Sequence, residues 1–197
     1  MLEMQDAMNS KVNPDWRNAG SEWYRAIWTE CAEMLDHYGW KWWKHQQPDM
    51  DQVKLEIVDI WHFAMSDLLI KGGTVEQVAD QIAEDLQDPS TAADIREAIE
   101  LLAGTTLQTQ SADVRIFACL MQLADLPFNE LYLMYVGKNV LNFFRQDHGY
   151  KDGSYIKVWS GREDNEHLAE ILSSLDPDDA GYADKVYQQL EAAYPAS

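Results

Sequence analysis

Cysteine is scarce in this 197-residue sequence, which contains only two of them. Cys31 and Cys119 both lie in apolar surroundings, and neither belongs to a C-x-x-C pair. This excludes a disulfide-rich extracellular scaffold and gives no signature of a zinc site. We expect both residues to be buried free thiols in a protein of the reducing cytoplasm.

Basic residues are also few, with 15 Lys and Arg against 34 Asp and Glu and a formal net charge of −19. A chain this acidic repels nucleic acid and anionic membrane surfaces, so we expect neither as a partner. It repels every other polyanion as well, unless metal ions or a local basic patch reverse the field.

Long apolar runs are absent. The longest apolar stretch covers residues 57–70, and four polar residues interrupt it: Asp59, His62, Ser66 and Asp67. It is too short and too polar to span a bilayer. The first residues carry Glu3 and Asp6 where a signal peptide has positive charge. We therefore expect a protein that is neither exported nor inserted in a membrane.

Apolar residues nevertheless make up 46% of the chain, enough for one well-packed domain covering residues 1–197. Helical periodicity dominates, with Ser21 and Thr74 as expected N-caps and Pro127 at a first helical position. The expected helices cover about 2–9, 21–38, 51–70, 74–86, 90–104, 112–124, 128–147, 163–173 and 178–194. The Gly-rich segment 148–161 has no helical stripe and predicts a loop or a short ribbon. The fold class is an all-α bundle.

Four acidic residues form a repeated pattern. Glu30 and Glu33, and then Glu56 and Asp59, are spaced i, i+3, so each pair shares one face of its expected helix. Acidic pairs usually lie on a solvated face, but both of these interrupt apolar helices, and the helix over 51–70 is apolar nearly all round. Buried carboxylates repel one another unless a cation neutralises them. All-oxygen ligation favours Mg²⁺ or Mn²⁺, so the pattern predicts a metal site.

Basic residues gather in one later segment. Lys138, Asn142 and Arg145 share a helix face, and residues 138–162 contain five bases and two acids. Tyr150, Lys157 and Arg162 follow, among glycines that let backbone approach an anion closely. The segment could instead pair with acidic surface elsewhere in the chain. Together with four metal-binding acids, however, a basic patch indicates phosphoryl chemistry.

Seven motifs, in order, resemble those of the dimeric all-α dUTPases, which belong to the wider all-α NTP pyrophosphatase group that includes the MazG proteins. They are Gln-Asp-Ala-Met-Asn at 5–9, Glu-Cys-Ala-Glu at 30–33, Trp-Lys-Trp-Trp-Lys at 40–44, Glu-Ile-Val-Asp-Ile-Trp-His-Phe-Ala-Met-Ser at 56–66, Gly-Lys-Asn-Val-Leu-Asn-Phe-Phe-Arg at 137–145, Gly-Tyr-Lys-Asp-Gly-Ser-Tyr-Ile-Lys-Val-Trp at 149–159 and Gly-Arg-Glu-Asp-Asn at 161–165. The resemblance covers core motifs from 5 to 165. Residues 72–126 and the helical tail 166–197 match no motif of the family.

The resemblance implies a homodimeric enzyme that hydrolyses dUTP, and dUDP as well, to dUMP with two or more Mg²⁺ ions, for which Mn²⁺ can substitute. Glu30 or Glu33 would accept a proton from the attacking water. The implied metal ligands are Glu30, Glu33, Glu56 and Asp59. The implied base-binding residues are Gln5, Asn9 and Trp43. The implied phosphate- and sugar-binding residues are Lys44, Lys138, Asn142, Arg145, Tyr150, Lys157 and Arg162.

Three alternatives remain open at this stage. One is a relative that acts on dCTP or a non-standard nucleotide. Another is a ferritin-like di-iron bundle, which needs two Glu-x-x-His motifs, whereas this chain has a single Asp-x-x-His at 59–62. The third is a non-catalytic acidic interaction protein, which explains the net charge but not the acids in apolar helices. His62 itself is expected to be a core histidine with its hydrogen bonds satisfied.

Overall fold

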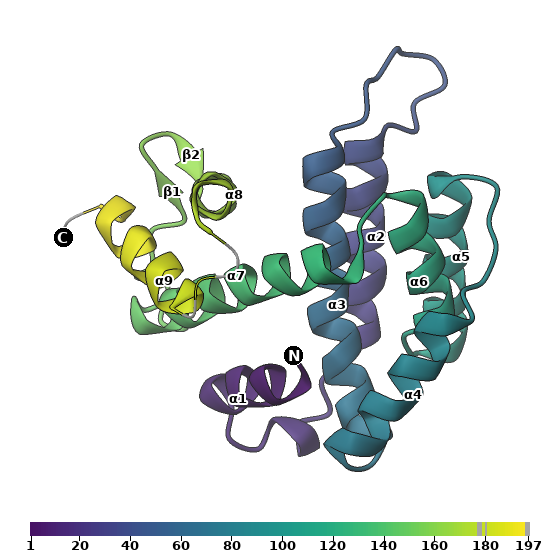
Figure 1. Ribbon diagram of the computed structural model, residues 1–197, viewed down its shortest axis with the longest axis horizontal. Coiled ribbons are helices and arrows are strands. Elements are labelled where there is room, and N and C mark those ends of the chain that lie inside the picture. Colours follow the sequence, from purple (N-terminus) through teal and green to yellow (C-terminus); the bar gives the residue numbers. More distant parts are fainter. Residues whose placement is uncertain (177–178, 180, 196–197) are drawn as a thin grey trace.

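The computed structural model describes residues 1–176, 179 and 181–195, and within them the regular secondary structure is almost entirely helical (Figure 1). The elements are α1 Leu2–Val12, the 3-10 turn η1 Trp16–Asn18, α2 Trp23–Tyr38, α3 Met50–Lys71, α4 Val75–Gln87, α5 Ile95–Thr109, α6 Val114–Leu123, α7 Phe128–Asp147, β1 Val158–Trp159, β2 Arg162–Glu163, α8 Asp164–Ser174 and α9 Tyr182–Ala193. The expectation of an all-α fold is confirmed.

Helix α3 packs against α1, α2, α4 and α7. Its apolar residues occur on nearly every side of the helix, which is why so many neighbours can cover it. Val53, Ile57 and Met65 are completely buried. Asp49 caps the helix by accepting a hydrogen bond from the backbone N–H of Gln52. The acidic residues that α3 carries are therefore held on a well-packed element.

The other helices form two groups around α3 (Figure 1). On one side α5 packs against α2 and α6, and α6 also packs against α4. On the other side α7 crosses α3, and α8 and α9 cover its far end together with the small ribbon. Helix α1 contacts both α3 and α7. The first and third quarters of the sequence therefore meet beside α3.

Four predicted helix boundaries in α2, α5 and α7 are wrong. Ser21 is exposed, and α2 begins one residue beyond Glu22, whose side chain makes no capping hydrogen bond. Helix α5 begins after Asp94, not near residue 90, because the Asp94 carboxylate accepts from the backbone N–H of Glu97. It then continues through Gly104 to Thr109. Before α7, proline occupies the N-cap position and not the first helical position.

The predicted loop or ribbon in the Gly-rich segment is realised as a two-residue antiparallel pairing of β1 with β2. Trp159 in β1 is fully buried and packs against Phe144 of α7 and His167 of α8, so the ribbon is anchored to the helices. The last helix begins at Tyr182, and the predicted start of this helix at residue 178 lies outside the described residues.

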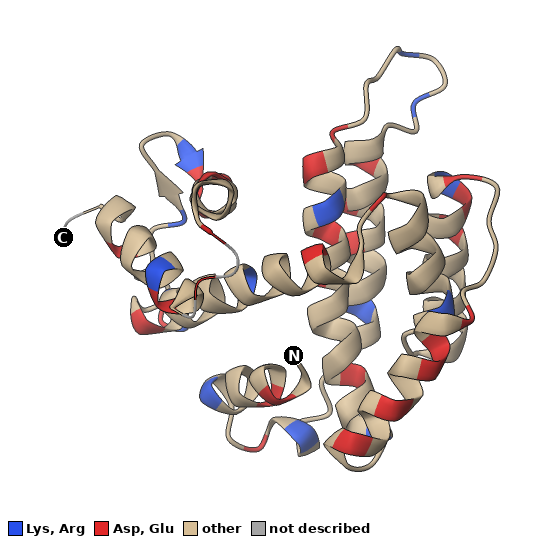
Figure 2. Cartoon of the chain, in the orientation of Figure 1, with Lys and Arg blue, Asp and Glu red and all other residues tan. Residues whose placement is uncertain are grey.

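Charge is distributed unevenly over this fold. Acidic residues follow the outer faces of α4 and α5, whereas the few basic residues are scattered (Figure 2). Both cysteines, Cys31 and Cys119, are buried free thiols, as expected. Among the described helices none combines the length and the apolar character needed to cross a membrane.

Candidate active site

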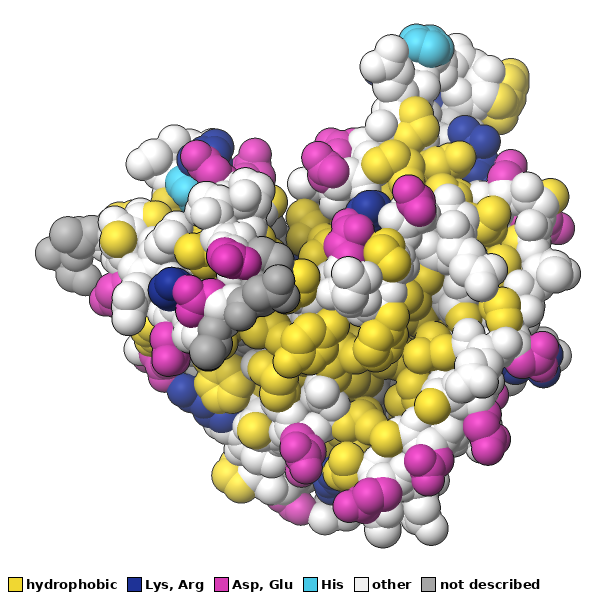
Figure 3. Space-filling model, in the orientation of Figure 1, with side chains coloured by type: hydrophobic (Ala, Val, Ile, Leu, Met, Phe, Trp, Pro, Cys, Tyr) yellow, Lys and Arg dark blue, Asp and Glu magenta, His cyan; other side chains and the backbone are white. Residues whose placement is uncertain are grey.

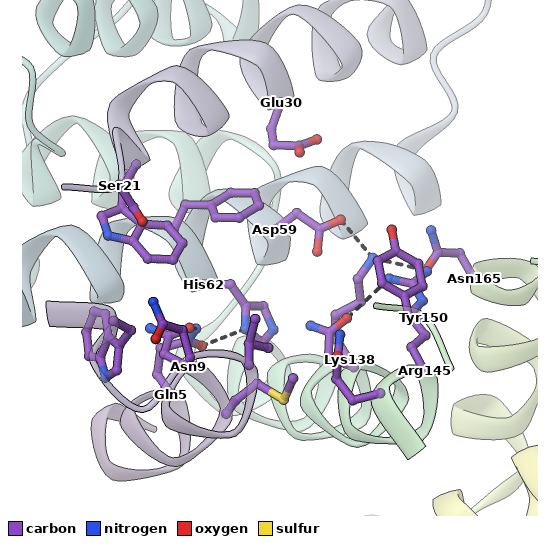
Figure 4. A pocket seen from close by; sticks show the side chains of 18 of the residues that line it. Gln5, Asn9, Ser21, Glu30, Asp59, His62, Lys138, Arg145, Tyr150 and Asn165 are labelled. Atoms are coloured by element: carbon purple, nitrogen blue, oxygen red, sulfur yellow. Dashed lines mark hydrogen bonds and ion pairs between the residues drawn. The ribbon is translucent and has the colours of Figure 1, made fainter. Parts of the chain in front are cut away.

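A cavity of about 480 Å³ opens where α1, α2, α3 and α7 meet (Figure 4). Its lining contains nine of the residues that the sequence predicts for the site: Gln5, Asn9, Glu30, Asp59, Lys138, Asn142, Arg145, Tyr150 and Lys157. These residues come from both ends of the sequence. The packing of α1 and α7 against α3 brings them together.

A carboxylate cluster adjoins one end of this cavity, and of its three members only Glu30 lines the cavity itself. Glu30, Glu33 and Glu56 each place a carboxylate oxygen within 4.8 Å of the other two. Burial, reinforced by the charges of Asp59 and Glu56, raises the pKa of Glu30 to about 8. Burial and the charge of Asp59 raise the pKa of Glu56 to about 7. A positive charge bound beside these carboxyl groups would therefore favour their ionised form.

Asp59 lies outside this three-residue cluster and forms an ion pair with Lys138. Its Oδ2 atom accepts from Lys138 Nζ at 2.7 Å, and Lys138 is only 3% exposed. Asp59 and Glu30 nevertheless point toward the same space from neighbouring helices (Figure 4). The second acidic pair thus joins the carboxylate cluster to the basic side of the cavity.

The residues of the carboxylate cluster are suited to bind a hard divalent cation. Every donor is a carboxylate oxygen, and hard cations such as Mg²⁺ and Mn²⁺ prefer oxygen ligands. Glu33 is exposed, so the cluster is open to solvent on one side. The imidazole of His37, which is not a member of the cluster, lies 3.4 Å from Glu56 and forms an ion pair with it when protonated. The donor set therefore gives no preference for zinc.

A neutral hydrogen-bond network forms the other end of the cavity. The hydroxyl of Ser66 donates to the backbone carbonyl of His62 at 2.9 Å, so its oxygen accepts from other partners. Gln5 Nε2 and Asn9 Nδ2 are those donors, at 3.1 and 2.9 Å. Gln5 Nε2 also donates to Asn9 Oδ1. The orientation of both amide groups is therefore fixed by a carbonyl that can only accept.

The same network sets the tautomer of His62. Because Nε2 of Gln5 donates to Ser66, the other amide atom, Oε1, faces His62 Nδ1 at a distance of 2.7 Å. An amide oxygen can only accept, so Nδ1 carries the proton. Burial lowers the pKa of His62 to about 3, which keeps the ring neutral. Its Nε2 atom is buried without a hydrogen-bond partner among the described residues, and the ring lines the cavity. The Nε2 lone pair of His62 is thus unpartnered and buried in a side chain that borders the cavity.

Basic side chains of α7 lie between the two ends. Lys138 contacts Asp59 and also donates to Asn165 Oδ1 at 3.0 Å. Arg145 pairs with Asp164, and its guanidinium lies 5.8 Å from the centre of the Tyr150 ring. The cavity therefore carries positive charge beside its carboxylates in a protein whose net charge is −19.

Three predicted site residues lie elsewhere. Trp43 and Lys44 belong to the loop between α2 and α3, which Figure 1 shows projecting from the helices. Trp43 is 57% exposed and packs edge to face with two other tryptophans of that loop. Arg162 on β2 pairs with Glu170. None of the three lines the cavity, so their roles stay predictions that rest on the resemblance.

Other residues that line the cavity had no site role assigned from the sequence, among them Trp16, Trp23, His62, Phe63 and Asn165. His62 was expected to be a satisfied core residue, and its unpartnered Nε2 shows that this is wrong. The spacing of Asp59, His62 and Ser66 on one helix face could have indicated the network, since i, i+3 and i+7 positions share a face.

Comparison with known proteins agrees with this geometry. A family model described as dUTPase matches residues 1–150, which is more than half of the chain and includes the acidic pairs and the start of the basic segment. No curated protein matches the sequence. The all-helical architecture is that of the all-α members. The chain therefore belongs to the all-α dUTPase family of dUTP diphosphatases.

Proposed function

We propose that the protein hydrolyses dUTP to dUMP and pyrophosphate, and dUDP to dUMP and phosphate, with Mg²⁺ as cofactor and Mn²⁺ as a substitute. This activity would keep uracil out of DNA and supply dUMP. One observation carries the proposal: a single cavity joins a neutral hydrogen-bonding end to a carboxylate end, with basic side chains between them. A nucleotide has the same order of base, sugar and charged phosphates.

The neutral end supports selection of uracil. Uracil carries a hydrogen on N3, which the Nε2 acceptor of His62 can receive. Cytosine presents a lone pair at N3, which would face the lone pair of Nε2. A site that leaves a buried polar group unpaired discriminates strongly against the wrong ligand. Gln5 and Asn9, fixed by Ser66, are proposed to hold the remaining polar edge of the base.

The carboxylate end supports metal-assisted hydrolysis. Glu30, Glu33, Glu56 and Asp59 are the residues proposed to hold two or more Mg²⁺ ions. Bound Mg²⁺ lowers the pKa of water and screens the phosphate oxygens. Water would attack the α-phosphorus, Glu30 or Glu33 would accept its proton, and pyrophosphate would leave as the bond to the β-phosphate breaks.

The basic side of the cavity supports phosphate and sugar binding. The residues proposed for this role within the cavity are Lys138, Asn142, Arg145, Tyr150 and Lys157. Their charges lie where the carboxylates would otherwise repel a triphosphate, and charged hydrogen bonds to phosphate are among the stronger ones in proteins. Trp43 and Lys44, for the base and the phosphates, and Arg162 remain proposals from the family resemblance alone.

We also propose that the enzyme is a cytoplasmic homodimer. Figure 3 shows a broad apolar surface between α7 and α4. Two hollows of about 610 and 330 Å³ adjoin there and share Ala83, Leu86 and Phe128. Continuous apolar surface of this kind is typical of an interface, and a second copy of the chain is the proposed occupant. Light scattering of the purified protein measures its mass directly, and a monomer would contradict the proposal.

Release of pyrophosphate from dUTP, dCTP, dTTP and dATP, assayed in parallel with Mg²⁺ and with EDTA, tests the function. We expect fast, Mg²⁺-dependent release from dUTP, and phosphate release when dUDP replaces it. Thymine shares the N3 hydrogen, so the dTTP assay asks whether the cavity also rejects the 5-methyl group. Release from dCTP alone would retain the metal site and overturn the base assignment. No release from any nucleotide would overturn the proposal.

A further inference from the structure

The first two residues of α8 bind the basic side chains of α7. Asp164 is completely buried, and its two oxygens accept from Arg145 Nε at 2.8 Å and Nη2 at 2.9 Å. Tyr155 donates its hydroxyl to Asp164 Oδ2 at 2.9 Å. Such a two-bond pairing fixes the plane of a guanidinium as well as its place. Arg145 therefore has one orientation relative to α8.

The hydrogen bonds of Arg145 can be counted donor by donor. A guanidinium has five N–H groups. Nε and one Nη2 hydrogen bind Asp164, the second Nη2 hydrogen points to Asn165 Oδ1 at 3.4 Å, and one Nη1 hydrogen reaches Asn142 at 3.2 Å. One Nη1 hydrogen is left over among the described residues. Arg145 lines the cavity, so this remaining donor is available to a ligand there.

Asn165 extends the arrangement to the second cation. Its Oδ1 atom accepts from Lys138 Nζ at 3.0 Å as well as from Arg145. Lys138 and Arg145 are two turns apart on α7, and one amide oxygen at the start of α8 contacts both. A change at the start of α8 therefore reaches the two positive charges that α7 contributes to the cavity.

The charge of Asp164 is preserved in spite of its burial. Burial by itself would raise the pKa of this carboxyl, but the hydrogen bonds and charge of Arg145, with the hydrogen bond from Tyr155, hold the pKa below its usual value. Asp164 is also separated from the cavity, because it is fully buried and does not line it. Asp164 can therefore act on a ligand only through its neighbours, chiefly Arg145, which it binds with both oxygens, and also Tyr155, whose ring contacts Tyr150 of the cavity lining.

We propose that Asp164 is a positioning residue for the triphosphate, holding Arg145 so that its free Nη1 hydrogen points into the cavity, with Tyr155 and Asn165 securing the same arrangement. This inference rests on the proposed function, in which Arg145 and Lys138 contact phosphate. Asp164, Tyr155 and Asn165 all lie beyond residue 150, where the family match ends. The site is therefore incomplete without the segment that follows the matched region.

The test compares two ligands in the full-length enzyme with Mg²⁺ present: a non-hydrolysable α,β-imido analogue of dUTP and deoxyuridine, which has no phosphate. For Asp164→Asn we expect affinity for the analogue to fall about tenfold, since a charge-assisted pair is lost, while affinity for deoxyuridine stays within about twofold. KM for dUTP should rise more than kcat falls. Tyr155→Phe should give a smaller change of the same kind, about threefold.

Asp152→Asn is the matched control. It removes a carboxylate from an exposed position of the same segment, where its partner is Ser154, and both affinities should stay at the wild-type values. If Asp164→Asn fails to fold, Tyr155→Phe carries the test, because it removes a single hydroxyl. A variant that loses affinity for both ligands equally, or for neither, would overturn the positioning role. Wild-type enzyme that binds the analogue no better than deoxyuridine would instead overturn the proposed function.

Discussion

The two ends of the cavity are built on opposite principles. At the neutral end, Gln5, Asn9 and Ser66 satisfy one another, and a single acceptor on His62 is left over. At the carboxylate end, Glu30 and Glu56 lie close together and their pKa values are raised, because like charges and burial oppose ionisation. The first end gains its order from the fold. The ionised carboxylates of the second end destabilise the folded state unless a cation neutralises them.

This difference separates specificity from catalysis. A network whose members are all satisfied holds its donors and acceptors in fixed directions, which is what recognition of a base requires. A group of unbalanced charges costs stability but binds a divalent cation well, and such sites are commonly functional. Substitutions at the two ends should therefore have different signatures, and the predictions that follow test this from the largest expected effect to the smallest.

Substitution at the carboxylate end should remove turnover while leaving the fold intact. Glu33→Gln keeps the shape of the side chain but removes a negative charge from the proposed metal site and one of the two candidate bases. We expect kcat to fall by about 10³-fold or more, with an unchanged circular dichroism spectrum. Asp36→Asn, one turn further along α2, is the matched control and should retain activity. Near-normal turnover by Glu33→Gln would refute the assignment.

Substitution at the neutral end should weaken selection of the base. His62→Phe keeps an aromatic ring but removes the Nε2 acceptor and the partner of Gln5 Oε1. We expect kcat/KM for dUTP to fall by about 10²-fold, as when a buried polar contact is lost. The value for dCTP should change much less, so the ratio between the two nucleotides is the measurement. An equal loss for both would mean that His62 supports the structure and does not read the base.

The carboxylate end should also control how stability depends on pH. A folded-state pKa of about 8 for Glu30, against an ordinary 4.5, means that the stability contributed by its proton is present at low pH and lost as pH rises toward 8. Glu30→Gln has no such proton to lose. In EDTA, the variant should therefore be more stable than wild type above pH 8, by about 1–2 kcal/mol after allowance for partial solvent exposure.

Melting temperatures of wild type and Glu30→Gln, measured from pH 5 to pH 9 in EDTA, give this difference directly. Comparing the two proteins cancels the contribution of His62, whose lowered pKa acts in the opposite direction because the unfolded chain binds its proton more readily. The difference should widen as pH rises, and Mg²⁺ should reverse it by stabilising wild type alone. A difference that stays constant with pH would contradict strong coupling among these carboxylates.

Substitution of Lys157, at the rim of the cavity, should have the smallest effect on activity. Lys157 is exposed and pairs with Glu163 at 2.9 Å, so its charge is partly screened. Lys157→Met should raise KM for dUTP by about two- to fivefold with little change in kcat, in keeping with the modest energy of exposed ion pairs. The effect should shrink as salt is added. A loss as large as that of His62→Phe would place Lys157 among the principal substrate contacts.

Much of the fold follows from the sequence because apolar periodicity identifies helices directly. The chain between Leu126 and His148 shows this, since its pattern predicted α7 within a residue or so. The start of α5 was harder, because Ser90, Thr91 and Asp94 are all good capping residues. Which of them caps depends on tertiary contacts, and Ser90 is occupied by a backbone bond to Arg115. Local sequence does not contain that information.

The site was predictable where residues conflicted with their surroundings. Acids that interrupt an apolar helix are unusual enough to be noticed, and so Glu30 and Glu56 were identified. His62 and Asp164 were not identified, because a histidine in a buried helix and one acid among 34 are both ordinary. The importance of His62 depends on the Nε2 atom that has no hydrogen-bond partner among the described residues. That of Asp164 depends on its pairing with Arg145, 19 residues earlier in the sequence.

A crystal structure with Mn²⁺ and the α,β-imido analogue of dUTP tests the central claim most directly, because an anomalous difference map locates the metal without assumptions. The account predicts Mn²⁺ at about 2.0–2.3 Å from carboxylate oxygens of Glu30, Glu33 and Glu56. It also predicts the uracil ring against His62 at the other end of the cavity. Mn²⁺ bound away from these carboxylates, or a base lying among them, would contradict it.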